Sequence, residues 1–187
     1  MDSEKIERAC RLLLEGIGED PTREGLRDTP RRVVAAWGER TAGYGADIAA
    51  LLKTDFDAEG YDEMIVCRDI AFYSTCEHHL LPFSGVAHVG YLPEKRVVGL
   101  SKMARLVEAF ATRLQVQERL TQQVAQAMQQ HVHPSGVGVI IRAKHLCMAC
   151  RGVKKPEADM VTSALTGSFR QAAVRAEFLA LTRNGGG

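Results

Sequence analysis

Apolar residues recur at helical spacing in the first 55 residues of the chain. The positions that define the first amphipathic helix are Ile6, Cys10, Leu13, Leu14 and Ile17. Thr29 followed by Pro30 predicts the start of a second helix, because proline is favoured in the first helical turn. A short third helix is expected near Ile48 to Leu52. We therefore predict that residues 1–57 form a helical N-terminal region.

From about residue 58 the chain changes to short runs rich in β-branched and aromatic residues, which are typical of strands. The expected strands are 64–73, 83–92, 137–147 and 160–165, with a hairpin turn at 93–96. Helical spacing predicts two consecutive helices between the second and third of these strands, beginning at Ser101, and a closing helix over 172–181. The glycines at 185–187 are expected to be a frayed tail.

This order of elements predicts an α+β domain over residues 58–187. Its antiparallel sheet should carry helices on one face. A sheet of four strands leaves two exposed edges, and exposed edges favour pairing with another chain. We therefore expect the protein to form oligomers.

The composition narrows the compartment and the partners. The net charge of +1 gives no overall field that would attract nucleic acid or an anionic membrane. No run approaches the roughly 18 apolar residues of a membrane helix. The polar N-terminus does not resemble a signal peptide, so we expect a cytoplasmic protein without membrane or nucleic-acid partners. The odd count of five cysteines argues against a disulfide framework and makes metal binding worth considering.

Two segments contain candidate metal ligands. Cys76 and His79 have the C-x-x-H spacing that allows one turn to bind one ion, and thiolate with imidazole suits zinc. Cys147 can add a third ligand from the end of another strand. Cys150 can complete a closed structural site, or water can occupy the fourth position of an open catalytic site. The residues alone leave both arrangements open, although an open site has a use for the neighbouring His78 and His145 in proton transfer.

Two further segments suggest ligand binding. Lys102 and Arg105 lie three residues apart near an expected helix start, where anions are favoured. Glu118 can accept two parallel hydrogen bonds, which is the pattern that the N1–H and 2-amino groups of guanine donate. Arg151 belongs to a basic stretch after the third strand. Each signal is weak alone, because such residues are usually solvent-facing.

Together these segments resemble the GTP cyclohydrolase I family. The motifs that carry the resemblance are G-E-D-P-T-R-E-G-L, D-T-P-R, S-T-C-E-H-H-L-L-P-F-S-G, V-G-L-S-K-M-A-R, L-Q-V-Q-E-R-L-T, H-L-C-M-A-C-R-G-V and V-T-S-A-L-T-G-S-F-R. The resemblance implies an open zinc site with Cys76, His79 and Cys147 as ligands and Cys150 as a bystander. It also implies a tunnelling fold whose sheets join into an oligomeric barrel, a homodecamer of two pentamers with active sites between subunits.

The resemblance also implies roles in the hydrolysis of GTP to 7,8-dihydroneopterin triphosphate and formate, the first step of folate and pterin synthesis. Zinc would activate the water that attacks C8 of the base. His145 would protonate N7, His78 would act on the ribose oxygen, and Ser101 would serve the later rearrangement. Glu118 would anchor guanine with Gln117 beside it. The expected triphosphate contacts are Lys102, Arg105 and Arg151.

Two other functions are compatible with parts of the pattern. One is a reductase of the same fold that acts on a deazaguanine base, which would use a cysteine nucleophile and no zinc. The other is a non-catalytic zinc module with a closed Cys₃His site. The paired C-E-H-H and H-L-C segments argue against the first, and the net charge near zero argues against a nucleic-acid-binding form of the second.

Overall fold

The structure is a computed structural model that describes residues 1–53 and 55–183. The chain divides into two compact units, Met1–Ala42 and Gly43–Gly187. The helical region predicted over residues 1–57 therefore covers the first unit and the beginning of the second. The glycines at 185–187, predicted to be frayed, lie outside the described residues.

Two helices, α1 (Ser3–Gly16) and α2 (Thr29–Arg40), make up most of the N-terminal unit. The side chain of Asp2 caps α1 by accepting a 3.1 Å hydrogen bond from the backbone N–H of Lys5. Pro30 lies in the first turn of α2, where its missing N–H costs no helical hydrogen bond. The first helix was predicted from its apolar spacing and the second from Thr29 followed by Pro30, and both are confirmed.

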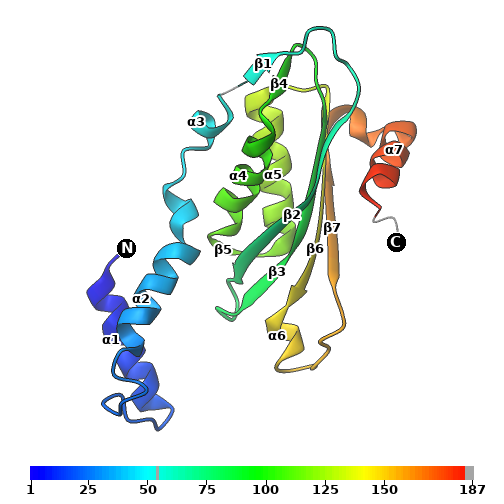
Figure 1. Cartoon of the computed structure of the whole chain (residues 1–187). Helices are drawn as coiled ribbons and strands as arrows, with labels where there is room; N and C mark the ends of the chain where they lie inside the picture. Colours follow the sequence, from blue (N-terminus) through cyan, green and yellow to red (C-terminus); the bar gives the residue numbers. More distant parts are fainter. Residues whose placement is uncertain (54, 184–187) are drawn as a thin grey trace. The chain divides into compact units, whose positions relative to one another are not determined.

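The second unit is built on a five-stranded sheet with the order β5-β2-β3-β6-β7 (Figure 1). After η1 (Ala42–Gly45), the elements in chain order are α3 (Ile48–Leu52), β1 (Asp55–Asp57), β2 (Ile65–Cys76), β3 (Pro82–Leu92), β4 (Arg96–Val98), α4 (Leu100–Ala111), β5 (Leu114–Gln115), α5 (Gln117–Val132), β6 (Gly136–His145), α6 (Leu146–Ala149), β7 (Met160–Leu165), η2 (Gly167–Arg170) and α7 (Ala172–Thr182). Every neighbouring pair in this sheet is antiparallel except β5, which runs parallel to the end of β2. The predicted α+β class is confirmed. Within the described residues, no helix has the length and apolar character needed to cross a bilayer.

The predicted hairpin after residue 92 is wrong in its pairing. β4 does not return along β3 but pairs with β1 in a separate two-stranded sheet, with Phe56 opposite Val97. The contact between β4 and β3 is made by a side chain instead, because the hydroxyl of Tyr91 accepts a 3.0 Å hydrogen bond from the N–H of Val98. The buried phenol therefore takes the place of a backbone ladder at this point.

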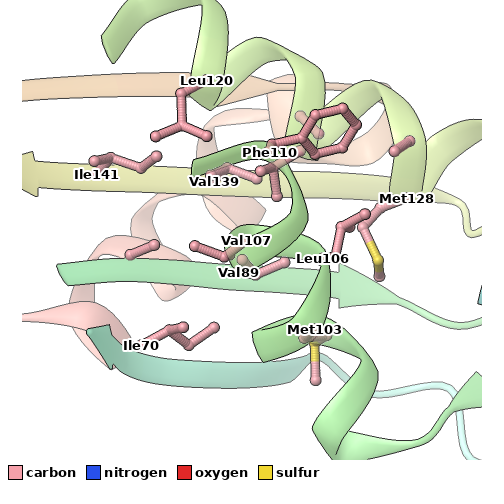
Figure 2. Packing of buried hydrophobic residues seen from close by; sticks show 14 of the residues in the cluster. Ile70, Val89, Met103, Leu106, Val107, Phe110, Leu120, Met128, Val139 and Ile141 are labelled. Carbon is pink, nitrogen blue, oxygen red and sulfur yellow. The ribbon is translucent and has the colours of Figure 1, made fainter. Parts of the chain in front are cut away.

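The main core lies between the sheet and the two long helices α4 and α5, which cover one face of it (Figure 1). Figure 2 shows Leu106 and Val107 of α4 and Leu120 of α5 packed over strand residues such as Val89 and Val139. The helical residues recur at three- and four-residue spacing, so they form one apolar face that the sheet buries. Each fully buried aliphatic side chain contributes about 1.5–3 kcal/mol. The predicted placement of helices on one face is confirmed for α4 and α5.

The other face of the sheet is covered at one end by η2 and α7. Phe169 and Phe178 are fully buried there, with ring centroids 5.2 Å apart. Glycines allow this approach, because a Cβ added to Gly138 would lie 2.4 Å from Phe169 Cδ1 and one added to Gly90 would lie 2.8 Å from Phe178 Cε2. The small second core therefore depends on strand positions without side chains.

We expect Gly138→Ala to lower the free energy of unfolding by about 1–3 kcal/mol, because the new methyl group overpacks the Phe169 ring. The matched control is Gly45→Ala, since a Cβ at Gly45 meets no atom within 4 Å. Urea unfolding followed by circular dichroism measures both variants. Equal midpoints for the two variants would show that the phenylalanine pair does not need this close approach.

Candidate functional site

Two strands, β2 and β6, finish at the same end of the sheet. Both are antiparallel to β3, so they run in the same direction and their last residues lie at the same end of the sheet. Cys76 is the last residue of β2 and His145 the last residue of β6. Phe83 of β3 lies between them, paired with Ser74 on one side and with His145 on the other. The topology therefore brings together two motifs that are about seventy residues apart in the sequence.

Beyond each strand end, a tight turn presents the remaining candidate ligands. The N–H of Leu80 donates a 2.8 Å hydrogen bond to the carbonyl of Cys76, which closes the turn that contains His79. The predicted third strand ends at His145 rather than 147, so Cys147 lies in the first turn of the short helix α6. The alternation of side chains along the strand therefore does not determine the direction of the Cys147 side chain. The bend of the chain into α6 directs it towards Cys76.

The ligand atoms of Cys76, His79 and Cys147 all lie within 4.8 Å of one another. The Sγ of Cys76 is 3.8 Å from the Nδ1 of His79. Tetrahedral zinc with bonds of about 2.3 Å to sulfur and 2.0–2.1 Å to nitrogen requires ligand separations of about 3.5–3.8 Å. The Cys76–His79 separation matches this value and the others are at most about 1 Å longer, so the group could hold such an ion. Cys150, which is exposed, is not a member of it.

The electrostatics of this group favour a cation. Burial raises the pKa of Cys147, and the nearby Cys76 acts in the same direction. Two thiolates this close repel each other unless a positive charge lies between them. A metal ion supplies that charge and makes deprotonation of the ligands favourable.

His145 lies next to this group but is not part of it. Its ring stacks on Phe83, with centroids 4.5 Å apart and an interplanar angle of 4°. Its Nε2 lies 2.8 Å from the Oε1 of Gln117. Burial lowers the pKa of His145, and the negative charge of Glu118 partly opposes this effect. The ring is therefore a fixed imidazole at the edge of the metal-binding group.

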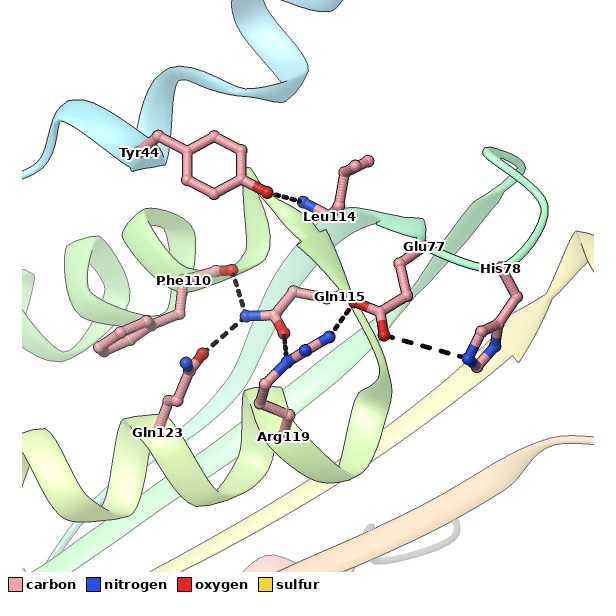
Figure 3. Close-up of polar contacts among 8 residues, drawn as sticks. All are labelled: Tyr44, Glu77, His78, Phe110, Leu114, Gln115, Arg119 and Gln123. Atoms are coloured by element: carbon pink, nitrogen blue, oxygen red, sulfur yellow. Dashed lines mark hydrogen bonds and ion pairs between the residues drawn. The ribbon is translucent and has the colours of Figure 1, made fainter.

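His78 occupies a different environment on the C-E-H-H turn. Its side chain is 64% exposed, and its Nε2 is 4.0 Å from Glu77 Oε1. Glu77 is paired with Arg119 of α5 (Figure 3). Besides His79, the site thus contains two imidazoles, one held between packed groups and one mostly exposed to solvent.

Figure 3 shows that the turn is tied to α5 and β5 by a polar network. Arg119 also donates a 3.1 Å hydrogen bond from Nε to Gln115 Oε1. The side-chain amide of Gln115 donates in turn to Gln123 Oε1 at 2.7 Å and to the carbonyl of Phe110 at 3.0 Å. Sequence analysis did not single out these residues, although Glu77 lies inside the C-E-H-H motif and Arg119 follows Glu118.

Glu118 lines a depression of about 460 Å³ beside α5 and β7. Its neighbours there include Thr162 and Ser163 of β7 and Arg170 of η2. The depression is open to solvent and is bordered by α5 and the edge strand β7. Arg151 is exposed in the segment that follows α6, close enough to Cys147 for its charge to act on that thiol.

The remaining predicted site residues lie in α4 and not at the end of the sheet that contains Cys76 and His145. Ser101, Lys102 and Arg105 lie in the first half of α4, which begins next to the buried Tyr91. Tyr91 pairs with Ile65, the first residue of β2. Cys76 is at the other end of that strand, about 36 Å from Ile65 at a rise of about 3.3 Å per residue. The part of α4 that lies near Cys76 is its last turn, where the carbonyl of Ala111 accepts a hydrogen bond from Ser74, and not the first turns that contain Lys102 and Arg105.

The fold and the site define an α+β enzyme with a Cys–His–Cys metal-binding group at one edge of an antiparallel sheet. The chain belongs to the GTP cyclohydrolase I family, because residues 6–183 match the model of the family described as GTP cyclohydrolase I. The predicted family is thereby confirmed.

Individual relatives agree with this family. The chain is 57% identical to a GTP cyclohydrolase 1 from Nitrosospira multiformis, over 92% of this chain and 91% of the relative. It is 55% identical to a GTP cyclohydrolase 1 from a Sulfurihydrogenibium species, over 97% and 95% of the two chains. Among solved structures, an archaeosine synthase QueF-Like in the apo form is 16% identical, with a TM-score of 0.47, over 56% of this chain and 94% of that chain.

We expect Arg119→Met to weaken binding of zinc, used as the probe metal, by about 10-fold, the low end of the loss seen for outer partners of metal ligands, because Arg119 acts on the ligand turn through Glu77. The substitution leaves Glu77 without its charged partner and releases the turn that contains Cys76 and His79. Competition with a chromophoric chelator measures the affinity. Arg142→Met is the control, since Arg142 pairs with Asp159 away from the turn. Equal affinities for both variants would contradict a role of the network in metal binding.

Proposed function

We propose that this protein hydrolyses GTP at C8 and rearranges the product to 7,8-dihydroneopterin triphosphate, with release of formate, as the first step of folate or pterin synthesis. The observation that carries the proposal is the Cys76–His79–Cys147 group with His145 beside it, in a chain of the GTP cyclohydrolase I family. A closed Cys₃His site receives no support, because Cys150 is not a member of the group.

Zinc is the metal that we propose for this group, with Cys76, His79 and Cys147 as its protein ligands. A bound zinc ion would supply a Lewis acid that activates water at neutral pH. Two thiols and one imidazole are a soft donor set that suits zinc better than magnesium or calcium. All five cysteines are free, which agrees with the reducing cytoplasm that we propose as the compartment.

The chain's own side chains would move the protons of the reaction. His145, fixed against Phe83, is proposed to protonate N7 of the base so that the imidazole ring of GTP can open. His78 is proposed to act at the ribose oxygen, where its exposure gives it freedom to follow the sugar as it opens. Ser101 is proposed to serve the proton transfers of the rearrangement.

Glu118 is the residue that we propose to bind the guanine base. An ionised carboxylate accepts two parallel hydrogen bonds, which matches the N1–H and 2-amino donors of the base. Glu118 lies next to Gln117, whose side chain contacts His145, so a base bound by Glu118 would lie close to that imidazole. Arg151, in the segment after α6, is proposed to contact the triphosphate.

We infer that each active site is completed by another copy of the chain. Lys102 and Arg105 lie in the first turns of α4, whereas it is the last turn of that helix that lies beside Ser74 and the strand end that contains Cys76. The sheet also has unpaired backbone groups, because β5 covers only Thr75 and Cys76 of β2. The family resemblance gives the assembly as a homodecamer, in which Ser101, Lys102 and Arg105 would come from a neighbouring subunit.

The proposed activity predicts formate and a pterin that becomes fluorescent after oxidation when the zinc-loaded protein is mixed with GTP. Cys147→Ala should lose both zinc and activity, because it removes one of three ligands. Cys150→Ala is the matched control and should keep both, since Cys150 is exposed and outside the group. Metal analysis on the same samples separates the two effects. The absence of formate at full zinc occupancy would overturn the proposal.

Shared active sites predict complementation between inactive variants. The double variant Lys102→Ala/Arg105→Ala and the single variant Cys147→Ala should each be nearly inactive alone. Co-expressed with different affinity tags and purified as mixed oligomers, they should regain activity in about a quarter of the sites by random assembly. A mixture of Cys76→Ala with Cys147→Ala is the control and should regain none, because both residues belong to one metal-binding group. No recovery in verified mixed oligomers of the first pair would contradict shared sites.

A further inference from the structure

We propose that Gln117 is a positioning residue that holds His145 in the tautomer protonated at Nε2, so that Nδ1 is the nitrogen that exchanges protons with the substrate. The catalytic part of this inference rests on the proposed function. The structural part stands on the contacts of the Gln117 side chain alone. It refines the substrate contact predicted for Gln117, because it assigns the carboxamide to His145.

The surroundings of Gln117 determine which end of its carboxamide is the amide. The residue is 1% exposed, and its Nε2 lies 3.0 Å from the carbonyl oxygen of Ile141 and 2.9 Å from that of Met160. Carbonyl oxygens only accept hydrogen bonds, so this end of the side chain must donate. The reversed orientation would place the amide oxygen within 3.0 Å of two carbonyl oxygens, which repel it and cannot donate to it.

The same orientation determines the protonation of the imidazole. With the amide end committed to the carbonyls, the other end is Oε1, which only accepts. It lies 2.8 Å from His145 Nε2, so that ring nitrogen must carry the hydrogen. A neutral histidine has one N–H, and the lone pair is therefore on Nδ1.

Both partners are held in place by further contacts. The ring of His145 stacks on Phe83, its cross-strand neighbour, which restricts rotation of the imidazole. The hydroxyl of Thr121 donates a 2.7 Å hydrogen bond to the backbone carbonyl of Gln117 and lies 2.6 Å from Thr162 Oγ1. Thr162 Oγ1 is in turn 3.1 Å from Gln117 Nε2. The acceptor that faces His145 is thus part of a packed network between α5 and β7.

This arrangement defines the proton transfer of the proposed reaction. The protonated imidazole carries hydrogens on both nitrogens, gives the one on Nδ1 to N7 of the base, and returns to the neutral form with Nε2–H still bonded to Gln117. A proton taken up later returns to Nδ1. Gln117 keeps its bonds throughout and does not need to touch the substrate.

The wild-type tautomer can be measured directly. Zinc-loaded protein labelled with [¹⁵N]histidine is examined by solid-state ¹⁵N NMR at a pH where its histidines are neutral. The chain has six histidines, and loss of a signal pair in His145→Asn identifies the one of interest. We expect a protonated Nε2 and an unprotonated Nδ1 for His145. A protonated Nδ1 would overturn the inference, and the state that is measured is that of the wild-type protein.

Gln117→Met removes the acceptor at similar side-chain volume. We expect the His145 tautomer preference to be lost in the spectrum and kcat to fall by about 10- to 100-fold, as for other orienting partners. KM for GTP should stay within about 3-fold, because uniform substrate binding is not affected. Gln130→Met, the same substitution at an exposed position of α5, is the control and should change neither. A rise in KM with unchanged kcat would instead mean that Gln117 binds the substrate and does not position His145.

The two proposals can fail separately. If the wild-type protein at full zinc occupancy forms no formate, the proposed function fails, whereas the tautomer measurement still decides the role of Gln117 towards His145. If the wild type turns over GTP and His145 is protonated at Nδ1, only the present inference is overturned.

Discussion

The site depends on the direction in which two strands run. β2 and β6 flank β3 and are both antiparallel to it, so their last residues lie at the same end of the sheet. Cys76 and His145 occupy those ends, and one turn beyond each end supplies His79 and Cys147. If β6 ran in the opposite direction, the same residues would lie at opposite ends of the sheet. The metal-binding group is therefore a consequence of the sheet topology, and the main core under α4 and α5 keeps these strands in register.

The same topology limits what one chain can do alone. α4 begins at the end of the sheet where β2 begins, and it returns towards the other end, where the carbonyl of Ala111 accepts a 2.7 Å hydrogen bond from Ser74 Oγ. The cationic residues in its first turns are thus at the end of α4 that is remote from the metal-binding group. A substrate with a base at one end and three phosphates at the other would need both groups close together. A neighbouring copy resolves this conflict without any change in the fold.

Much of this architecture could be predicted from local sequence patterns. The apolar spacing predicted α4 and α5, and the β-branched runs predicted β2, β3, β6 and β7 within a few residues. The pairing of β4 with β1 could not be predicted, because Phe56 and Val97 are far apart in sequence and both strands have only three residues. The ligand spacing of Cys76 and His79 could be read from the motif, whereas the position of Cys147 required the bend into α6.

The buried glutamine networks could not be predicted from the sequence for a different reason. Gln115, Gln117 and Gln123 lie close together in a segment whose polar residues look solvent-facing from the sequence. The structure buries the first two to 1% exposure and pairs their amides with backbone carbonyls. Which of several glutamines is buried depends on where β5 ends and α5 begins, a boundary that periodicity locates only to within a few residues.

The two histidines outside the metal-binding group differ in their surroundings, which fix the imidazole of His145 and leave that of His78 mobile. His145 is stacked, hydrogen-bonded and buried enough for its pKa to be lowered, so its orientation and tautomer are set before any ligand arrives. His78 is mostly exposed: its Nε2 lies 4.0 Å from the Glu77 carboxylate, which Arg119 neutralises, and its ring lies edge-on to that of His79. A preorganised imidazole suits a proton transfer whose geometry is the same in every turnover, because no reorganisation is needed at that step. A mobile imidazole suits a group that must follow a sugar through ring opening, and exposure makes such movement inexpensive in free energy.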